Sequence, residues 1–175
     1  MRFLLIDRIL EVKKHNFISG IVTPSFEEVN LKRPESNVNN SPNSSYPQIL
    51  ILESLMQLAG KLVQYSTDFK YSAMVLSIRK VEFADILIKA GDRLQMSLEM
   101  SSSNNEGAYF KNGIVTLCKY HDVRNNGEKI DEKIIVLKSE SAVCTFFPTE
   151  KLFLSIEHVR TDFNNLLGNY DIEYK

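Results

Sequence analysis

One carboxylate interrupts the most apolar stretch of this 175-residue chain. Residues 46–60 read YPQILILESLMQLAG, and Glu53 is the only charged residue among them. Removing a carboxyl group from water raises its pKa, and such groups recur where enzymes transfer protons. Glu53 is therefore a candidate for acid–base chemistry. The plainer alternative is a solvated residue that pairs with Gln57, one helical turn further along.

The element that would carry Glu53 is a long helix over Gln48–Ser66. Pro47 is suited to the position at which a helix begins. Apolar side chains nearly surround the axis in this stretch, so we expect the helix to be buried on most sides. The polar residues that remain lie on one narrow stripe, made of Glu53, Gln57, Lys61 and Gln64.

Strands are predicted on both sides of this helix. Residues 3–12 and 17–23 form a first pair, and residues 24–47, rich in Asn, Ser and Pro, form a long loop. After the helix, apolar and polar residues alternate, which is typical of strands with one wet face. These later strands are expected over residues 74–83, 94–100, 108–122 and 130–147, with Asn125, Asn126 and Gly127 turning the last two into a hairpin.

The order of these elements predicts an α+β fold in which an antiparallel sheet wraps around one apolar helix. A further helix is predicted within residues 151–168, because apolar residues recur there at helical spacing. We expect a single domain over residues 1–147, with residues 148–175 as a C-terminal helical extension of it. One sheet cannot cover a helix that is apolar nearly all round, so a second subunit is expected to cover the rest.

Composition argues against several classes of function. A net charge of −1 and a pI near 6.3 do not suit a nucleic-acid binder, which needs a basic face for phosphates. The sequence has no apolar run long enough to span a membrane and no signal-peptide core, so we expect a cytoplasmic protein. Cys118 and Cys144 fit small buried hydrophobic residues in strands. Because neither they nor His15, His121 and His158 have metal-ligand spacing, no metal or other cofactor is expected.

Three short strings resemble one known family. Residues 3–11, FLLIDRILE, are similar to its "FLLVDRVLE" opening, and residues 47–57, PQILILESLMQ, to its "PGVLIVEAMAQ" helix start. Phe83 with Gly91-Asp92 resembles its "F…PGD" turn. In this order and spacing, over roughly residues 3–146, the strings resemble the hot-dog fold and within it the FabZ-type 3-hydroxyacyl-acyl carrier protein dehydratases.

This resemblance implies a site and a substrate. In the family, a loop His in "GHFPGKPIMPG" takes the α-proton, a helix Glu handles the departing hydroxyl, and a backbone N–H at the helix start polarises the thioester carbonyl. The helix Glu matches Glu53. Pro47, Gln48, Ile49 and Gln57 would then contact a substrate carried as an acyl carrier protein or CoA thioester, in an apolar tunnel beside the helix. The resemblance implies no cofactor.

The sequence departs from the family at the histidine. The string "HFPG" is absent, and counting back the family's interval from Glu53 without a gap reaches Asn39. An amide has no useful basicity near neutral pH, so Asn39 cannot take an α-proton. Gln48 stands where the family has a glycine, and the nearest upstream histidine is His15, in the first strand pair.

Three functions fit these residues. The first is a dehydratase in fatty-acid or polyketide-like synthesis, active when another residue or subunit supplies the base. The second is a silent subunit of a heterodimer with another hot-dog chain, and a homodimer is the alternative assembly. The third is an acyl thioesterase in which Asn39 and Glu53 activate water. Arg79, Lys80 and Lys89 form either a basic rim for an acidic carrier protein or an ordinary solvated strand face.

Overall fold

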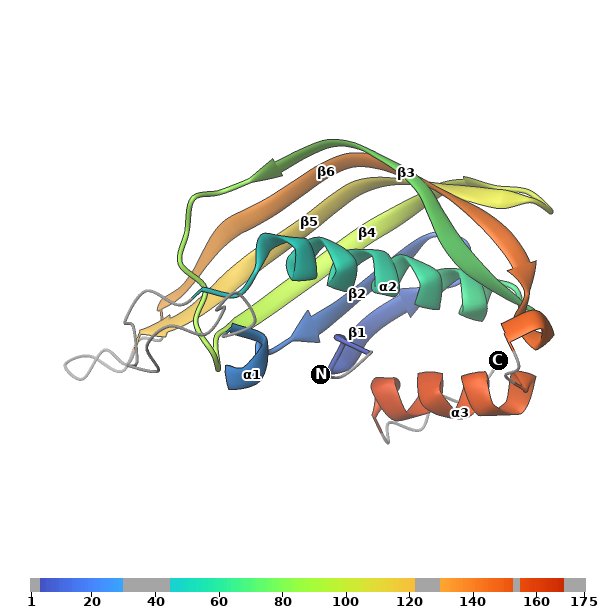
Figure 1. Cartoon of the computed structure of the whole chain (residues 1–175), viewed down its shortest axis with the longest axis horizontal. Coiled ribbons are helices and arrows are strands. Elements are labelled where there is room, and N and C mark those ends of the chain that lie inside the picture. Colours follow the sequence, from blue (N-terminus) through green and yellow to red (C-terminus); the bar gives the residue numbers. More distant parts are fainter. Residues whose placement is uncertain (1–3, 30–44, 122–129, 153–154, 169–175) are drawn as a thin grey trace, which may run out of the picture.

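The chain was analysed as a computed structural model that describes residues 4–29, 45–121, 130–152 and 155–168. Six antiparallel strands form one strongly curved sheet, and a long helix lies in its concave side (Figure 1). This helix is α2, Gln48–Ser66. The strands are β1 (Arg8–Lys13), β2 (Phe17–Val22), β3 (Tyr71–Phe83), β4 (Arg93–Ser103), β5 (Gly107–His121) and β6 (Ile130–Pro148), in the sheet order β1-β2-β4-β5-β6-β3.

The expected α+β architecture, a sheet wrapped around one helix, is confirmed. The bounds of α2 are those predicted from periodicity. The β5–β6 hairpin is also present, with pairing that runs from Gly107 opposite Thr145 to His121 opposite Ile130. Its predicted turn, Asn125 to Gly127, lies outside the described residues.

Two glycines of the sheet lie directly beneath α2. A Cβ atom on Gly20 of β2 would stand 2.9 Å from the Arg8 carbonyl oxygen and 3.0 Å from Leu58 Cδ1. A Cβ atom on Gly113 of β5 would stand 3.0 Å from Leu55 Cδ2. Leu55 and Leu58 are fully buried. The helix can therefore approach the sheet closely only because these two positions carry no side chain.

The long loop ahead of α2 contains a short helix that the sequence analysis did not predict. This helix, α1, covers Phe26–Val29. It is held by a reciprocal cap in which the Ser25 N–H donates to Glu28 Oε2 at 2.9 Å and the Glu28 N–H donates to Ser25 Oγ at 3.2 Å. The Ser-x-x-Glu signature of such a cap is present in the sequence, although four residues are too few to show a period. The first strand was also placed too early, since β1 begins at Arg8.

The predicted C-terminal helix is present as α3, Ile156–Leu167. Ser155 caps its start, because the Ser155 hydroxyl accepts from the His158 N–H at 3.0 Å. On its inner side Phe163 is fully buried and stacks on Tyr65 of α2, with ring centroids 5.2 Å apart. The Phe69 ring meets the Phe163 ring edge-on, with ring centroids 5.4 Å apart. The helix thus packs against the C-terminal end of α2, and it also contacts β1.

Replacing Gly20 with alanine should destabilise the fold. The added methyl group meets a backbone oxygen that cannot rotate away, so we expect the free energy of unfolding to fall by about 1–3 kcal/mol. Gly60→Ala is the matched control, because a Cβ atom there meets nothing within 4 Å and the site is inside α2. It should raise stability by about 1 kcal/mol. Urea unfolding of both variants measures this, and an unchanged midpoint for Gly20→Ala would contradict the close-packing argument.

Candidate functional site

Glu53 lies in the second turn of α2 with its side chain exposed. Its Oε1 accepts a hydrogen bond from Gln57 Nε2 at 3.0 Å. The same Gln57 amide accepts, through Oε1, from the backbone N–H of Leu5 at 2.9 Å. The structure therefore shows the plainer alternative, a solvated residue that pairs with Gln57. The expectation that the apolar helix removes this carboxyl from water is wrong.

The start of α2 offers hydrogen-bond donors close to this carboxylate. Pro47 is the N-cap residue and makes no side-chain cap bond. The first N–H groups of any helix lack intrahelical partners, and the positive end of the helix dipole lies there. Gln48 and Ile49 in this first turn are exposed, Ile49 to 65%. Since Ile49 and Glu53 are four positions apart, they share a face about 6 Å apart along the axis.

This arrangement can act on two neighbouring polar groups of one ligand. A carbonyl oxygen placed at the helix start would be polarised by backbone N–H groups. A group one turn further along would meet the Glu53 carboxyl, which can give or take a proton. Pro47 itself is buried, so its role is to open the helix, whereas Gln48, Ile49 and Glu53 face outward.

The remaining residues of the polar stripe are covered to a greater degree. Gln64 donates to Ser72 Oγ of β3 at 3.3 Å. Lys61 is half-buried, and desolvation lowers the pKa of its amine, while the negative charge of Asp162 on α3 partly opposes this effect. Glu53 is the exposed member of the stripe, and Gln57, Lys61 and Gln64 are all half-buried.

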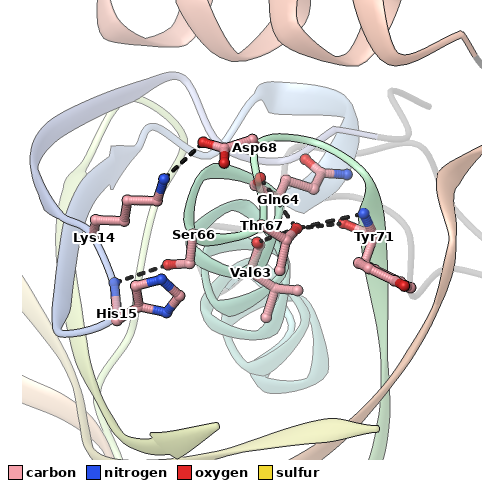
Figure 2. A network of polar contacts seen from close by, with 8 residues as sticks. All are labelled: Lys14, His15, Val63, Gln64, Ser66, Thr67, Asp68 and Tyr71. Atoms are coloured by element: carbon pink, nitrogen blue, oxygen red, sulfur yellow. Dashed lines mark hydrogen bonds and ion pairs between the residues drawn. The ribbon is translucent and has the colours of Figure 1, made fainter. Parts of the chain in front are cut away.

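His15 does not take the place of the missing base. Figure 2 shows it in the β1–β2 turn beside Ser66, the last residue of α2, where its backbone N–H donates to Ser66 Oγ at 2.9 Å. Lys14 beside it pairs with Asp68 Oδ1 at 2.6 Å. Ser66 follows Glu53 by 13 positions, which is about 20 Å of helix. This network joins the turn to the end of α2 and serves the fold.

His158 also lacks a contact with Glu53. His158 is exposed on α3, with its Nε2 3.5 Å from Asp162 Oδ2. His121 is the last residue of β5, opposite Ile130. Within the described residues, Glu53 forms neither a hydrogen bond nor an ion pair with any histidine. Asn39, the other residue that was aligned with the site, lies outside the described residues.

One small cavity lies beside α2 in the part of the chain that the structure describes. A cavity of about 10 Å³ lies between Met56 and the sheet, lined also by Leu98 and Phe110. A volume of this size holds about one water molecule. An acyl chain would therefore need side-chain movement here, and Met56 has the flexible thioether chain that permits it.

Other candidate groups carry little chemistry. Burial raises the pKa of the Cys144 thiol to about 11, so the nucleophilic thiolate is scarce near neutral pH. Lys80 is paired with Glu140, which raises the pKa of its amine and favours an ordinary solvated strand face over a basic rim. Among the described residues, no group of three or more His, Cys, Asp or Glu could hold a metal ion. The helices described are all too short or too polar to cross a membrane.

Comparisons with known proteins agree with the strings found in the sequence. No family model matches the chain. FabZ, the 3-hydroxyacyl-[acyl-carrier-protein] dehydratase of Buchnera aphidicola (subspecies Acyrthosiphon pisum, strain Tuc7), is 29% identical over 124 residues, 67% of this chain and 78% of the relative. FabZ of Rickettsia typhi is 26% identical over 119 residues, with the same coverage. The chain is a divergent FabZ-like member of the hot-dog fold.

A solved structure supports the fold of this FabZ-like chain. The dehydratase heterocomplex ApeI:P from Xenorhabdus doucetiae matches 92% of this chain and 90% of its own, with a TM-score of 0.54 and 12% sequence identity. At that identity the likeness concerns the fold alone. In this chain the carboxylate on α2 is Glu53, and its printed hydrogen bond within the described part is to Gln57.

Two interactions along the polar stripe were missed from the sequence. One is the bond from the Leu5 N–H to Gln57, which joins backbone to side chain and leaves no trace in residue type. The other is the electrostatic effect of Asp162, which raises the pKa of the Lys61 amine against the larger effect of burial. Asp162 follows His158 by one turn of the predicted C-terminal helix, but the sequence did not show which face of that helix meets α2.

The charge of Asp162 can be tested through Lys61. Because Asp162 raises the pKa of the Lys61 amine against the larger effect of burial, Asp162→Asn should lower that pKa further. Heteronuclear NMR of the Lys61 side chain through a pH titration measures the change. Asp68→Asn is the control, because Asp68 is exposed and pairs with Lys14. An equal effect of both substitutions would show that Asp162 has no specific contact with Lys61.

Proposed function

We propose that this FabZ-like protein takes part in the dehydration of 3-hydroxyacyl thioesters carried on an acyl carrier protein. The observation that carries the proposal is the exposed Glu53 carboxyl, one turn from the uncapped start of α2. The names of the curated relatives support the substrate class.

In the proposed reaction, the thioester carbonyl lies at the start of α2, where the backbone N–H groups polarise it. A base removes the proton at C2, the C2–H electron pair forms the new double bond, and the C3–O bond breaks. Glu53, protonated beforehand, gives its proton to the departing hydroxyl, so that water and a 2-enoyl thioester leave. The base then gives its proton to Glu53, directly or through solvent, and both groups return to their starting protonation states.

The base is the part of this scheme that the described residues do not supply. Asn39 cannot act as one, and His15 lies about 20 Å away along α2. We infer that the base comes either from a second chain or from a residue whose side chain the structure does not describe. The lack of a histidine contact also favours a second candidate function, in which this chain is the silent subunit beside a hot-dog chain that carries the histidine.

The edge of the sheet favours pairing with such a chain. β3 is an edge strand of 13 residues, and it pairs with β6 on its other side. Met74 and Leu76 on it are exposed to 56% and 63%. Long edge strands with exposed apolar residues tend to pair with another chain. We propose that β3 meets the β3 strand of a second hot-dog chain, either a copy of this protein or a different one.

Activity and its dependence on Glu53 test the first proposal. With 3-hydroxyacyl carrier protein of several chain lengths, the protein should form enoyl product, and Glu53→Gln should lower kcat by about 100-fold or more. Glu157→Gln, an exposed glutamate on α3, should leave kcat unchanged. Mass spectrometry of the carrier-bound product and a thiol assay are run together.

Each other outcome of this assay has a distinct meaning. Release of free thiol by the wild-type protein that is lost in the Glu53→Gln variant identifies a thioesterase. Product that forms only after a histidine-bearing hot-dog chain from the native host is added identifies the silent subunit. If neither the chain alone nor the chain with such a partner turns over the thioester, the proposal is overturned.

Assembly through β3 predicts a second effect. Leu76→Asp places a charge on the proposed interface and should shift the protein toward the monomer. Leu10→Asp is the matched control, since Leu10 is exposed to 42% on β1, at the opposite edge of the sheet. Sedimentation velocity at several concentrations measures the mass. Equal masses for Leu76→Asp and wild type would place the interface elsewhere.

A further inference from the structure

We propose that Gln57 is a positioning residue that holds the Glu53 carboxylate in one orientation, rather than a residue that contacts substrate. The inference rests on the proposed role of Glu53 and assigns Gln57 a different task from the one the family resemblance implied. It starts from how the two ends of the Gln57 amide are used.

Both ends of this amide are engaged. Its oxygen accepts from the Leu5 N–H at 2.9 Å, and its nitrogen donates to Glu53 Oε1 at 3.0 Å. A backbone N–H can only donate and a carboxylate can only accept, so the two partners together allow one orientation of the amide.

The anchor of this arrangement is rigid. Leu5 is exposed to only 2%, as is Ile6 beside it. The following residue, Asp7, is held on β2, since its N–H donates to the Ile21 carbonyl at 2.9 Å and its Oδ2 accepts from the Thr23 N–H at 2.5 Å. A hydrogen-bonded path therefore leads from the sheet through this N-terminal segment and Gln57 to Glu53.

This path leaves one carboxylate oxygen for chemistry. Within the described residues, Glu53 Oε1 is held by Gln57, and Oε2 makes no hydrogen bond. An exposed glutamate otherwise moves among several rotamers, and ordering it costs free energy at each turnover. A carboxyl group fixed in advance avoids this cost. Losing the Gln57 amide should therefore slow the chemical step without weakening substrate binding.

The contact itself can be tested by NMR without any turnover. The side-chain amide 1H and 15N signals of Gln57 should move as Glu53 titrates in the wild-type protein, and this movement should vanish in Glu53→Gln. Gln64, seven positions along the same helix, is the internal control, since its amide donates to Ser72 Oγ. Gln57 signals that are insensitive to pH and to Glu53→Gln would overturn the inference.

The kinetic consequence is tested with Gln57→Met, which keeps the length of the side chain and removes the amide. We expect kcat to fall by about 10-fold to 100-fold with KM unchanged, as for other residues that orient a catalytic group. Gln64→Met should keep both constants. A raised KM with an unchanged kcat would show that Gln57 binds substrate, and wild-type values for both would show that it positions nothing.

The two tests separate this inference from the proposed function. If the protein turns over no thioester but the Gln57 signals still follow Glu53, the proposed function fails and the positioning contact is supported. If the protein is active and Glu53 is required, while Gln57→Met has wild-type constants, the proposed function is supported and the positioning role is overturned.

Discussion

The close contact between α2 and the backbone of the sheet is the constraint on which the rest of this structure depends. Leu58 packs against Gly20 of β2, and Leu55 packs against Gly113 of β5. Both contacts lie on one side of the helix, so they determine which face of α2 is buried against the sheet. The polar stripe from Glu53 to Gln64 then lies on a part of α2 that other segments of the chain must cover. A larger residue at either glycine would shift α2, and with it the polar stripe and the contacts made along it.

The residues of the stripe are closed off by segments far apart in the sequence. Gln57 meets the N-terminal segment at Leu5, Lys61 lies near Asp162 of α3, and Gln64 meets β3 at Ser72. Since α3 is anchored by Phe163 at the C-terminal end of α2, it covers that end of the stripe. Glu53 stays exposed because it stands at the other end. The openness of the site therefore follows from where the extra helix packs.

The sequence predicts the helix and strands well because their periods are strong. Apolar residues around Glu53 set the bounds of α2, and the hairpin of β5 and β6 follows from alternation around a tight turn. The sequence does not show that β3 lies at the edge of the sheet, because strand order depends on long-range pairing. It also does not show the Leu5–Gln57 bond, because any residue has the same backbone N–H. At the site, the sequence predicts Glu53 as a candidate and its pairing with Gln57 as the alternative, whereas the anchoring of Gln57 by Leu5 required the structure.

The position of Glu53 also limits how a complete site can form. His15 is fixed to the far end of α2 through Ser66, and the Lys14–Asp68 pair joins the same turn to the segment after that helix, so no rotation of a side chain brings His15 to the carboxylate. His158 already faces Asp162 on α3. Neither His15 nor His158 is therefore placed to act as the base for Glu53, and the proposed base must come from another residue or from another chain. The exposed edge of β3, with Met74 and Leu76 on it, is where the sheet can accept such a chain. Assembly and catalysis would then depend on the same contact, because half of the acid–base pair would be contributed by the partner.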